Sequence, residues 1–259
     1  PDMLLGAGTV LSIEQVDRAV AAGAKFIVTP GYNPSVVDYC VSKEIPVVPG
    51  CMDTNAIEMA LEAGLDTVKF FPAEAAGGLK MMKALAGPYT NLKFIPTGGI
   101  NKDNLCDYLA FKKIIACGGS WMVKGDLVNN DRFDEIERIT AEAVDKMLNF
   151  RVVHIGINND DEAEANAQVR KLNELFGFKS DVKSASTFAS DAIEVCRKRF
   201  PGLHGHIAIG TGNVERAVYY LEKKGVEFDF STAKYKGERL TSVYLTDCIG
   251  GFAIHLVEK

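Results

Sequence analysis

Six short apolar runs recur at a regular spacing through the first half of the chain, and this repeat restricts the fold more than any other feature. Successive runs begin about 20 to 26 residues apart, which is the length of one strand followed by one helix. Each run is apolar throughout, as parallel strands covered by helices are. The first half is therefore predicted to be an α/β domain with a parallel sheet. The runs span residues 3–10, 25–31, 45–50, 67–73, 93–99 and 113–120.

Helix signals fill the intervals between these runs. Ser12 with Gln15 three residues later is typical of a capping box, and Gly23 marks the end of that helix. Asn33 followed by Pro34 is typical of an N-cap with proline at the first helical position. The alternation of strand and helix fits either a doubly wound sheet or a (β/α)8 barrel. Further helices are expected over residues 53–61, 101–109 and 131–148.

The ends of the runs favour the barrel. Nearly every run finishes in small or turn residues, and in a (β/α)8 barrel all strand ends face one pocket. The last two runs end in Thr97-Gly98-Gly99 and Gly118-Gly119-Ser120. Barrels often bind phosphate in loops after strands 7 and 8, although tight turns without a ligand are the alternative. We therefore expect a (β/α)8 TIM-type barrel that lacks its first two strands in this sequence, with residues missing before Pro1.

One lysine interrupts a buried run. Lys69 lies between Val68 and Phe70, and a buried ammonium either extends to water or loses its proton. If the run is a barrel strand, Lys69 can face the pocket, where apolar surroundings lower its pKa. A neutral lysine amine attacks ketones to form a Schiff base. No histidine occurs in residues 1–150, so the sequence favours imine chemistry in this half over a histidine-bound metal.

Six motifs of this half, in the same order, resemble those of the 2-keto-3-deoxy-6-phosphogluconate / 4-hydroxy-2-oxoglutarate aldolases. They are GAGTV, TPG, KFFPAEAAGG, AGPY, PTGGI and GGSW. The resemblance implies that Lys69 is the Schiff-base nucleophile and that Thr9 and Thr97 donate to the pyruvyl carboxylate. The remaining implied substrate contacts are a pocket wall, Phe71, and a phosphate cradle made of Gly98, Gly99, Gly119 and Ser120.

The same resemblance implies a reaction and its setting. A small phosphorylated 2-keto acid of carbohydrate metabolism (the Entner–Doudoroff pathway) would be cleaved to pyruvate and an aldehyde through a lysine imine, with no cofactor, in a homo-trimer. Members of the family carry a glutamate acid/base on strand 2 and an arginine on strand 1, which this sequence does not contain. Glu74 lies beyond Pro72 and is expected in a surface loop or helix start rather than as a replacement base.

The second half follows a different pattern, which occurs twice. VHIGI (153–157) and GHIAI (205–209) are predicted strands, and each precedes a predicted helix, over residues 163–176 and 214–224. DAIEV (191–195) and FAIHL (252–256) are predicted to be the last strands of the two copies. The repeat predicts an α+β domain of two βαβββ modules. The expected domains are an aldolase barrel at residues 1–149 and a duplicated domain at 150–259.

Ligand-type side chains occupy equivalent places in the two copies. His154 and His206 lie on the first strands, and Glu194 and His255 lie on the last. Imidazole and carboxylate groups bind zinc, nickel, iron and manganese, so pairing of the modules predicts a divalent metal site. Half-buried histidines without a metal are the alternative. The pattern resembles the vicinal oxygen chelate family of glyoxalases and ring-cleavage dioxygenases, although that family usually has a carboxylate at the position of His255.

Composition excludes several other classes of partner. The net charge of −5 and the absence of a dense Lys/Arg run argue against nucleic acid. No apolar run is long enough to span a bilayer. The six cysteines are scattered without a C-x-x-C pair, as expected for reduced thiols in a cytoplasmic protein.

The favoured function is Schiff-base aldol cleavage by the barrel. One rival is a truncated, inactive barrel that only binds phosphate or pyruvate. A second is a metal-dependent isomerase, lyase or dioxygenase activity in the glyoxalase-like half. Another phosphate-binding barrel, such as an epimerase, is disfavoured because it has no need of Lys69.

Overall fold

The computed structural model describes residues 3–259, which fold into two compact units. One unit reaches to Lys146, and the other runs from Met147 to Lys259. The change of unit falls near the end of the helix α7 (Phe133–Leu148), close to the predicted boundary between residues 149 and 150. No helix in residues 3–259 is both long enough and apolar enough to cross a membrane.

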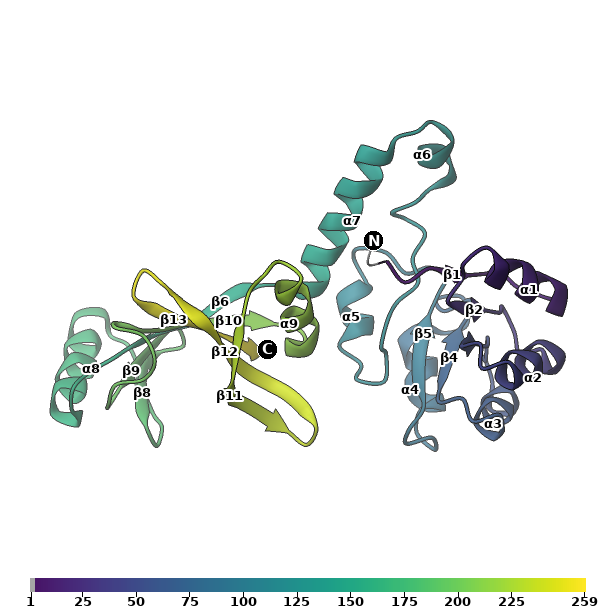
Figure 1. Cartoon of the computed structure of the whole chain (residues 1–259). Helices are drawn as coiled ribbons and strands as arrows, with labels where there is room; N and C mark the ends of the chain where they lie inside the picture. Colours follow the sequence, from purple (N-terminus) through teal and green to yellow (C-terminus); the bar gives the residue numbers. More distant parts are fainter. Residues whose placement is uncertain (1–2) are drawn as a thin grey trace. The chain divides into compact units, whose positions relative to one another are not determined.

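Within residues 3–146, five short parallel strands form the frame of the first unit (Figure 1). Backbone pairing joins β1 to β2, β2 to β3 and β4 to β5, and an isolated bridge between Gly50 and Lys69 joins β3 to β4. The spatial order follows the sequence, as a barrel built from βα units requires. The strands are β1 (Gly6–Ala7), β2 (Phe26–Val28), β3 (Val47–Val48), β4 (Thr67–Phe70) and β5 (Lys93–Pro96).

The sixth predicted strand, at residues 113–120, is not a regular strand. Its pairing consists of isolated parallel bridges to the neighbourhood of β5, between Phe94 and Ile114 and between Thr97 and Gly118. The interruption falls at residues 115–117, between the two bridged positions, and Gly118 itself pairs with Thr97. The bridges still place this segment beside β5, where the sixth strand was expected.

Helices connect the strands, and Figure 1 shows α1, α2 and α3 on the same side of them. Three helices begin with side-chain caps: Ser12 accepts from the N–H of Gln15, Asn33 from that of Ser35, and Asp53 from that of Ala56. These caps confirm the predicted starts. The helices before α7 are α1 (Ile13–Ala21), α2 (Pro34–Ser42), α3 (Thr54–Glu62), α4 (Gly78–Leu85), α5 (Leu105–Leu109) and α6 (Gly125–Asn129).

The helix expected from Asn101 begins later, at Leu105. Asn101 and Asn104 instead build a turn, because their side chains accept from the backbone N–H groups of Asp103 and Asn101 at 2.8 and 2.9 Å. The amide groups of both asparagines also donate to the Gly99 carbonyl, at 3.3 and 3.1 Å. The turn therefore fixes the glycine loop that follows β5.

The core of the first unit lies between its first helices and strands. Apolar side chains of α1 and α2 pack against those of β2 and β3, so these two helices cover one face of the strands. The buried members of this cluster are Val10, Val16, Ile27, Val36, Val37, Cys40 and Val47.

In residues 147–259, eight strands form one sheet to which each module contributes four neighbouring strands. The order is β11-β12-β13-β10-β6-β9-β8-β7, and the two first strands, β6 and β10, pair antiparallel at the centre. The two βαβββ modules are present as predicted, and the structure shows that they join through their first strands. The first module is β6 (Arg151–Ile157), α8 (Glu162–Phe176), β7 (Asp181–Val182), β8 (Ser186–Ser190) and β9 (Ile193–Cys196). The second is β10 (Gly205–Thr211), α9 (Val214–Glu222), β11 (Phe228–Lys236), β12 (Arg239–Ile249) and β13 (Phe252–Glu258).

The helix of the first module covers one face of its strands. Ala165 and Val169 of α8 pack against Ala189 of β8 and Val195 of β9. Successive side chains of a strand point to opposite faces, so Phe188 and Glu194 lie on the face away from α8. This face carries the ligand-type side chains.

Candidate functional site

The carboxyl ends of the parallel strands in the first unit lie at one edge of the sheet, as in a barrel. A cavity of about 390 Å³ lies there, and its lining includes Gly31, Gly50 and Phe71. Gly50 lets the strand ends approach, because a Cβ at this position would lie 2.1 Å from the carbonyl oxygen of Pro30. The local backbone therefore requires glycine at this edge.

Lys69 is the buried cation nearest to this edge on β4. The residue is 8% exposed, and its Nζ lies 4.6 Å from the ring centroid of Phe71, which lines the cavity. Within residues 3–259, the ammonium has no ion pair or hydrogen bond. Burial lowers the pKa of Lys69. The side chain is therefore closer to the neutral, nucleophilic form than a solvated lysine would be.

The two glycine-rich loops meet at the end of β5. Gly98 and Gly99 have positive φ angles of 96° and 83°, a backbone region that favours glycine. Thr97 lies over Gly118, where a Cβ would come within 2.5 Å of the threonine Oγ1. The Trp121 ring lies over the next glycine, Gly119, at a distance that leaves no room for a Cβ. Phe71 also approaches this loop, since its Cδ2 would lie 3.3 Å from a Cβ on Gly98.

Other candidate residues of the first unit lie in different surroundings. Thr9 is exposed and follows β1, several strands away from Thr97 in the order of the sheet. Ser120 is also exposed. The Glu74 carboxylate accepts a hydrogen bond from the buried Tyr108 side chain of α5. The Cβ and Cγ atoms of Glu74 occupy the space that a Cβ on Gly99 would need. Glu74 thus braces the glycine loop.

The sequence model of KDPG and KHG aldolases matches residues 1–139. The chain belongs to the KDPG and KHG aldolase family. The match covers the first unit nearly to its end. It confirms the class I aldolase predicted from the six motifs, and the parallel strands confirm an aldolase barrel type of fold.

Individual aldolases of known sequence or structure agree with this membership. The 2-dehydro-3-deoxy-phosphogluconate aldolase of Haemophilus influenzae is 53% identical over 145 residues, which are 56% of this chain and 68% of the relative. The KDPG aldolase of Legionella pneumophila, solved with pyruvate captured as a covalent carbinolamine intermediate, is 40% identical with a TM-score of 0.52, over 54% of this chain and 68% of that one. The enzyme of Zymomonas mobilis, solved with 3-phosphoglycerate, is 35% identical with a TM-score of 0.51, over 55% and 67%.

The second unit brings three of its predicted ligands together on the face that α8 leaves open. The Nε2 atoms of His154 and His206 are 3.1 Å apart, and each lies 3.1 Å from Oε2 of Glu194. Three atoms at nearly equal separations form a triangle. Ligands about 2.1 Å from one metal ion lie about 3.0 Å apart at right angles and about 3.4 Å apart in a tetrahedron. The observed separations fit a facial set of two imidazoles and one carboxylate.

His255 completes the predicted group as a fourth member. It is buried, its Nε2 has no hydrogen-bond partner within residues 3–259, and its ligand atoms lie within 4.8 Å of those of His154 and His206. Burial, together with the charges of His206 and His154, lowers the pKa of His255 to about 3. The ring is therefore neutral, which is the form that binds a metal ion.

Glu194 is held as a carboxylate by its partners. Burial alone would raise its pKa, but hydrogen bonds with His154, His206 and Ser186 outweigh burial and hold the pKa of Glu194 well below its usual range. The Sγ of Cys196, on the same strand, lies within 4.8 Å of the ligand atoms of Glu194 and His206. Burial, followed by the charge of Glu194, raises the pKa of its thiol to about 12. The sequence indicates this cysteine only as one of six scattered, reduced thiols, although its place two residues after Glu194 puts it on the same face.

The backbone leaves room for the histidine rings. Gly156 pairs with His206 across β6 and β10, and a Cβ on Gly156 would lie 2.1 Å from Cε1 of that ring. Ala208 similarly pairs with His154. Small residues opposite both histidines therefore let each imidazole lie across the neighbouring strand.

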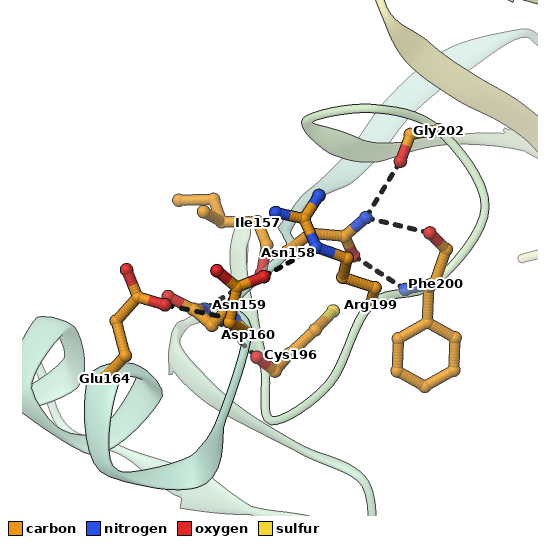
Figure 2. Close-up of polar contacts among 9 residues, drawn as sticks. All are labelled: Ile157, Asn158, Asn159, Asp160, Glu164, Cys196, Arg199, Phe200 and Gly202. Carbon is orange, nitrogen blue, oxygen red and sulfur yellow. Dashed lines mark hydrogen bonds and ion pairs between the residues drawn. The ribbon is translucent and has the colours of Figure 1, made fainter.

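A polar network fixes the connection between the two modules (Figure 2). Asn158, directly after β6, donates to the carbonyls of Phe200 and Gly202 at 2.8 and 2.9 Å and accepts from the N–H of Phe200 at 2.9 Å. Asn159 donates to the carbonyl of Cys196 at 3.0 Å. The segment that leads from β9 to β10 is thereby bound to the end of β6, which carries His154.

Proposed function

We propose that the first unit cleaves a phosphorylated 2-keto-3-deoxy sugar acid, or 4-hydroxy-2-oxoglutarate, to pyruvate and an aldehyde at Lys69. The supporting observation is the state of this lysine, which is buried, has a lowered pKa and faces an aromatic side chain at the edge where the strands end. The carbinolamine captured in the Legionella relative supports the same chemistry.

In the proposed reaction, the neutral Lys69 amine attacks the 2-keto carbon, and loss of water from the carbinolamine gives an iminium ion. The iminium accepts the electron pair of the C3–C4 bond as it breaks, and the C4 hydroxyl loses its proton to form the aldehyde. An enamine of pyruvate remains on the lysine. Protonation at C3 and addition of water then release pyruvate and the free amine.

The proposed substrate contacts follow the two ends of such a molecule. Thr9 and Thr97 would donate to the pyruvyl carboxylate, and Phe71 would form the wall over the imine. The glycine loops would bind the phosphate through backbone N–H groups, with Gly98, Gly99, Gly119 and Ser120 as the contacts. The positive φ angles of Gly98 and Gly99 support this role. Such angles favour glycine, and a loop of glycines has no side chains to keep a phosphate away from its N–H groups.

Pyruvate release from 2-keto-3-deoxy-6-phosphogluconate tests the proposal. We expect turnover by the chain and no turnover by Lys69→Arg, which keeps the charge but cannot form the imine. Lys93→Arg on the adjacent β5 is the matched control and should retain activity, because this lysine is exposed and paired with Asp66. A folded chain that changes Trp121 fluorescence with pyruvate but releases none from the substrate would support the binding-only alternative.

We also propose that the protein is a cytoplasmic homo-oligomer, and a trimer by family resemblance. Its proposed domains are an aldolase domain at residues 1–149 and a glyoxalase-like domain at 150–259. Light scattering of the purified chain tests the trimer. A mass of one chain at micromolar concentration would refute it.

A second candidate function is a divalent metal centre in the second unit. The 3.1 Å triangle of His154, Glu194 and His206 favours it. The Nε2 of buried His255, which has no hydrogen-bond partner among residues 3–259, offers a fourth ligand. A bound divalent ion would supply Lewis-acid polarisation of a small oxygenated substrate. Metal analysis of the purified chain tests this centre: about one chelator-removable ion per chain supports it, and none after incubation with excess Zn²⁺, Ni²⁺, Mn²⁺ or Fe²⁺ refutes it.

A further inference from the structure

We propose that Ser186 and Ser242 are paired positioning residues, one in each module, that hold the last-strand ligands Glu194 and His255 in their metal-binding orientation. This inference rests on the proposed metal centre. It concerns two side chains outside the ligand set, each of which forms a hydrogen bond to one ligand.

The two serines occupy matching places in the duplicated fold. Ser186 lies on β8, two residues before Phe188, which pairs directly with Glu194 on β9. Ser242 lies on β12, two residues before Tyr244, which pairs directly with His255 on β13. Both modules thus contain a serine and then an aromatic residue on the strand that neighbours a ligand.

Ser186 determines which oxygen of Glu194 faces the histidines. Its hydroxyl donates to Oε1, while Oε2 lies 3.1 Å from both His154 and His206. The terminal torsion of a glutamate has broad wells, so an unrestrained carboxylate rotates readily. With Oε1 occupied by the hydroxyl, one oxygen remains directed at the metal position.

Ser242 places a hydroxyl that can accept a hydrogen bond beside Nδ1 of His255. Its Oγ lies 3.2 Å from Nδ1, while Nε2 has no partner within residues 3–259. A neutral imidazole has one N–H and one lone pair. When Nδ1–H donates to Ser242, the lone pair is left on Nε2, and the ring is ready to bind a metal ion.

The aromatic members of the pairs restrain the rings. Phe188 meets the His154 ring edge to face at 5.3 Å, and Tyr244 stacks on His255 at 4.7 Å. Both serines are nearly fully buried, at 3% and 7% exposed. A hydroxyl inside a sheet is costly unless it is hydrogen-bonded, so two buried serines that both contact ligands are better explained by the ligands than by packing.

Titration of the purified full chain with Co²⁺, in competition with a chromogenic chelator, tests this inference. Ser186→Ala and Ser242→Ala should weaken Co²⁺ binding by about ten- to a hundredfold each. They should also change the visible Co²⁺ spectrum, which a merely structural role would leave unaltered. The hydroxyl-retaining variants Ser186→Thr and Ser242→Thr should restore most of the affinity.

Ser190→Ala is the matched control, because Ser190 lies on β8 but its Oγ accepts from the N–H of Ala192 instead of contacting a ligand. It should bind Co²⁺ as the wild type does. Wild-type affinity in both alanine variants, or an equal loss in the control, would overturn the positioning role while leaving the metal centre intact. A wild-type chain that binds no Co²⁺ would instead overturn the centre itself, and the positioning role with it.

Discussion

Replacement of Lys69 by methionine is expected to stabilise the first unit while abolishing imine formation. Methionine keeps the buried apolar stem of this 8% exposed residue and removes only its ammonium, which has no ion pair or hydrogen bond within residues 3–259. Removing a poorly compensated buried polar group should gain about 1–3 kcal/mol. Losing the contact with the Phe71 ring, 4.6 Å away, should offset about 1 kcal/mol. We therefore expect a net gain of about 1 kcal/mol.

Urea unfolding followed by Trp121 fluorescence measures this gain, because the chain has one tryptophan and it lies in the first unit. At a slope of about 2 kcal/mol per molar urea, the midpoint should rise by about 0.5 M. Lys93→Met is the control on the adjacent strand. The ammonium of Lys93 is exposed and 2.9 Å from Asp66, so its removal should change stability by less than about 1 kcal/mol and in the unfavourable direction.

The gain should also depend on pH in one direction. Burial lowers the pKa of folded Lys69 below its unfolded value of about 10.4. Below the folded pKa both states are protonated, and the wild type bears the full cost of the buried charge. As pH rises from the folded pKa towards the unfolded one, this cost disappears, and so does the advantage of methionine. A variant less stable than the wild type, or a gain that persists unchanged at alkaline pH, would show that the buried charge of Lys69 does not destabilise the first unit.

Three further substitutions probe the backbone around the two sites. Gly50→Ala should destabilise the first unit by about 1–3 kcal/mol in the same urea assay, whereas Gly31→Ala should not, because no atom lies within 4 Å of its new Cβ. Equal effects of the two substitutions would contradict the close approach of Gly50 to the Pro30 carbonyl. Gly156→Ala should displace the His206 ring and weaken Co²⁺ binding at least about tenfold in equilibrium dialysis, and unchanged affinity would argue against the triangle as the binding set. Asn158→Ala should destabilise the second unit by about 1–3 kcal/mol and speed hydrogen exchange between β9 and β10; unchanged exchange would remove the network from this role.

Local chemistry made much of the first unit predictable. Ser12, Asn33 and Asp53 act as caps because their side chains bind N–H groups two or three residues away, which the sequence displays directly. The predicted helix start at Asn101 was wrong for the same chemical reason. The side chains of Asn101 and Asn104 bind backbone N–H groups in a turn, and the helix begins only at Leu105.

Features that depend on pairing between distant strands were harder to predict from the sequence. The four ligand-type residues of the second unit could be found because the module is duplicated. Ser186, Ser242 and the need for glycine at position 156 could not, since each follows from the register between strands and has no local signature. The irregular segment at residues 113–120 has the same origin, because apolar composition indicates a strand but does not show how well it pairs.

The proposed aldol cleavage depends on Lys69 as its nucleophile. Borohydride reduction in the presence of pyruvate, followed by intact-mass and peptide mass spectrometry, tests it most directly. We expect one reduced pyruvyl adduct per chain, located on Lys69 and absent from Lys69→Met. A folded chain without an adduct, or with adducts spread over exposed lysines such as Lys93, would contradict it.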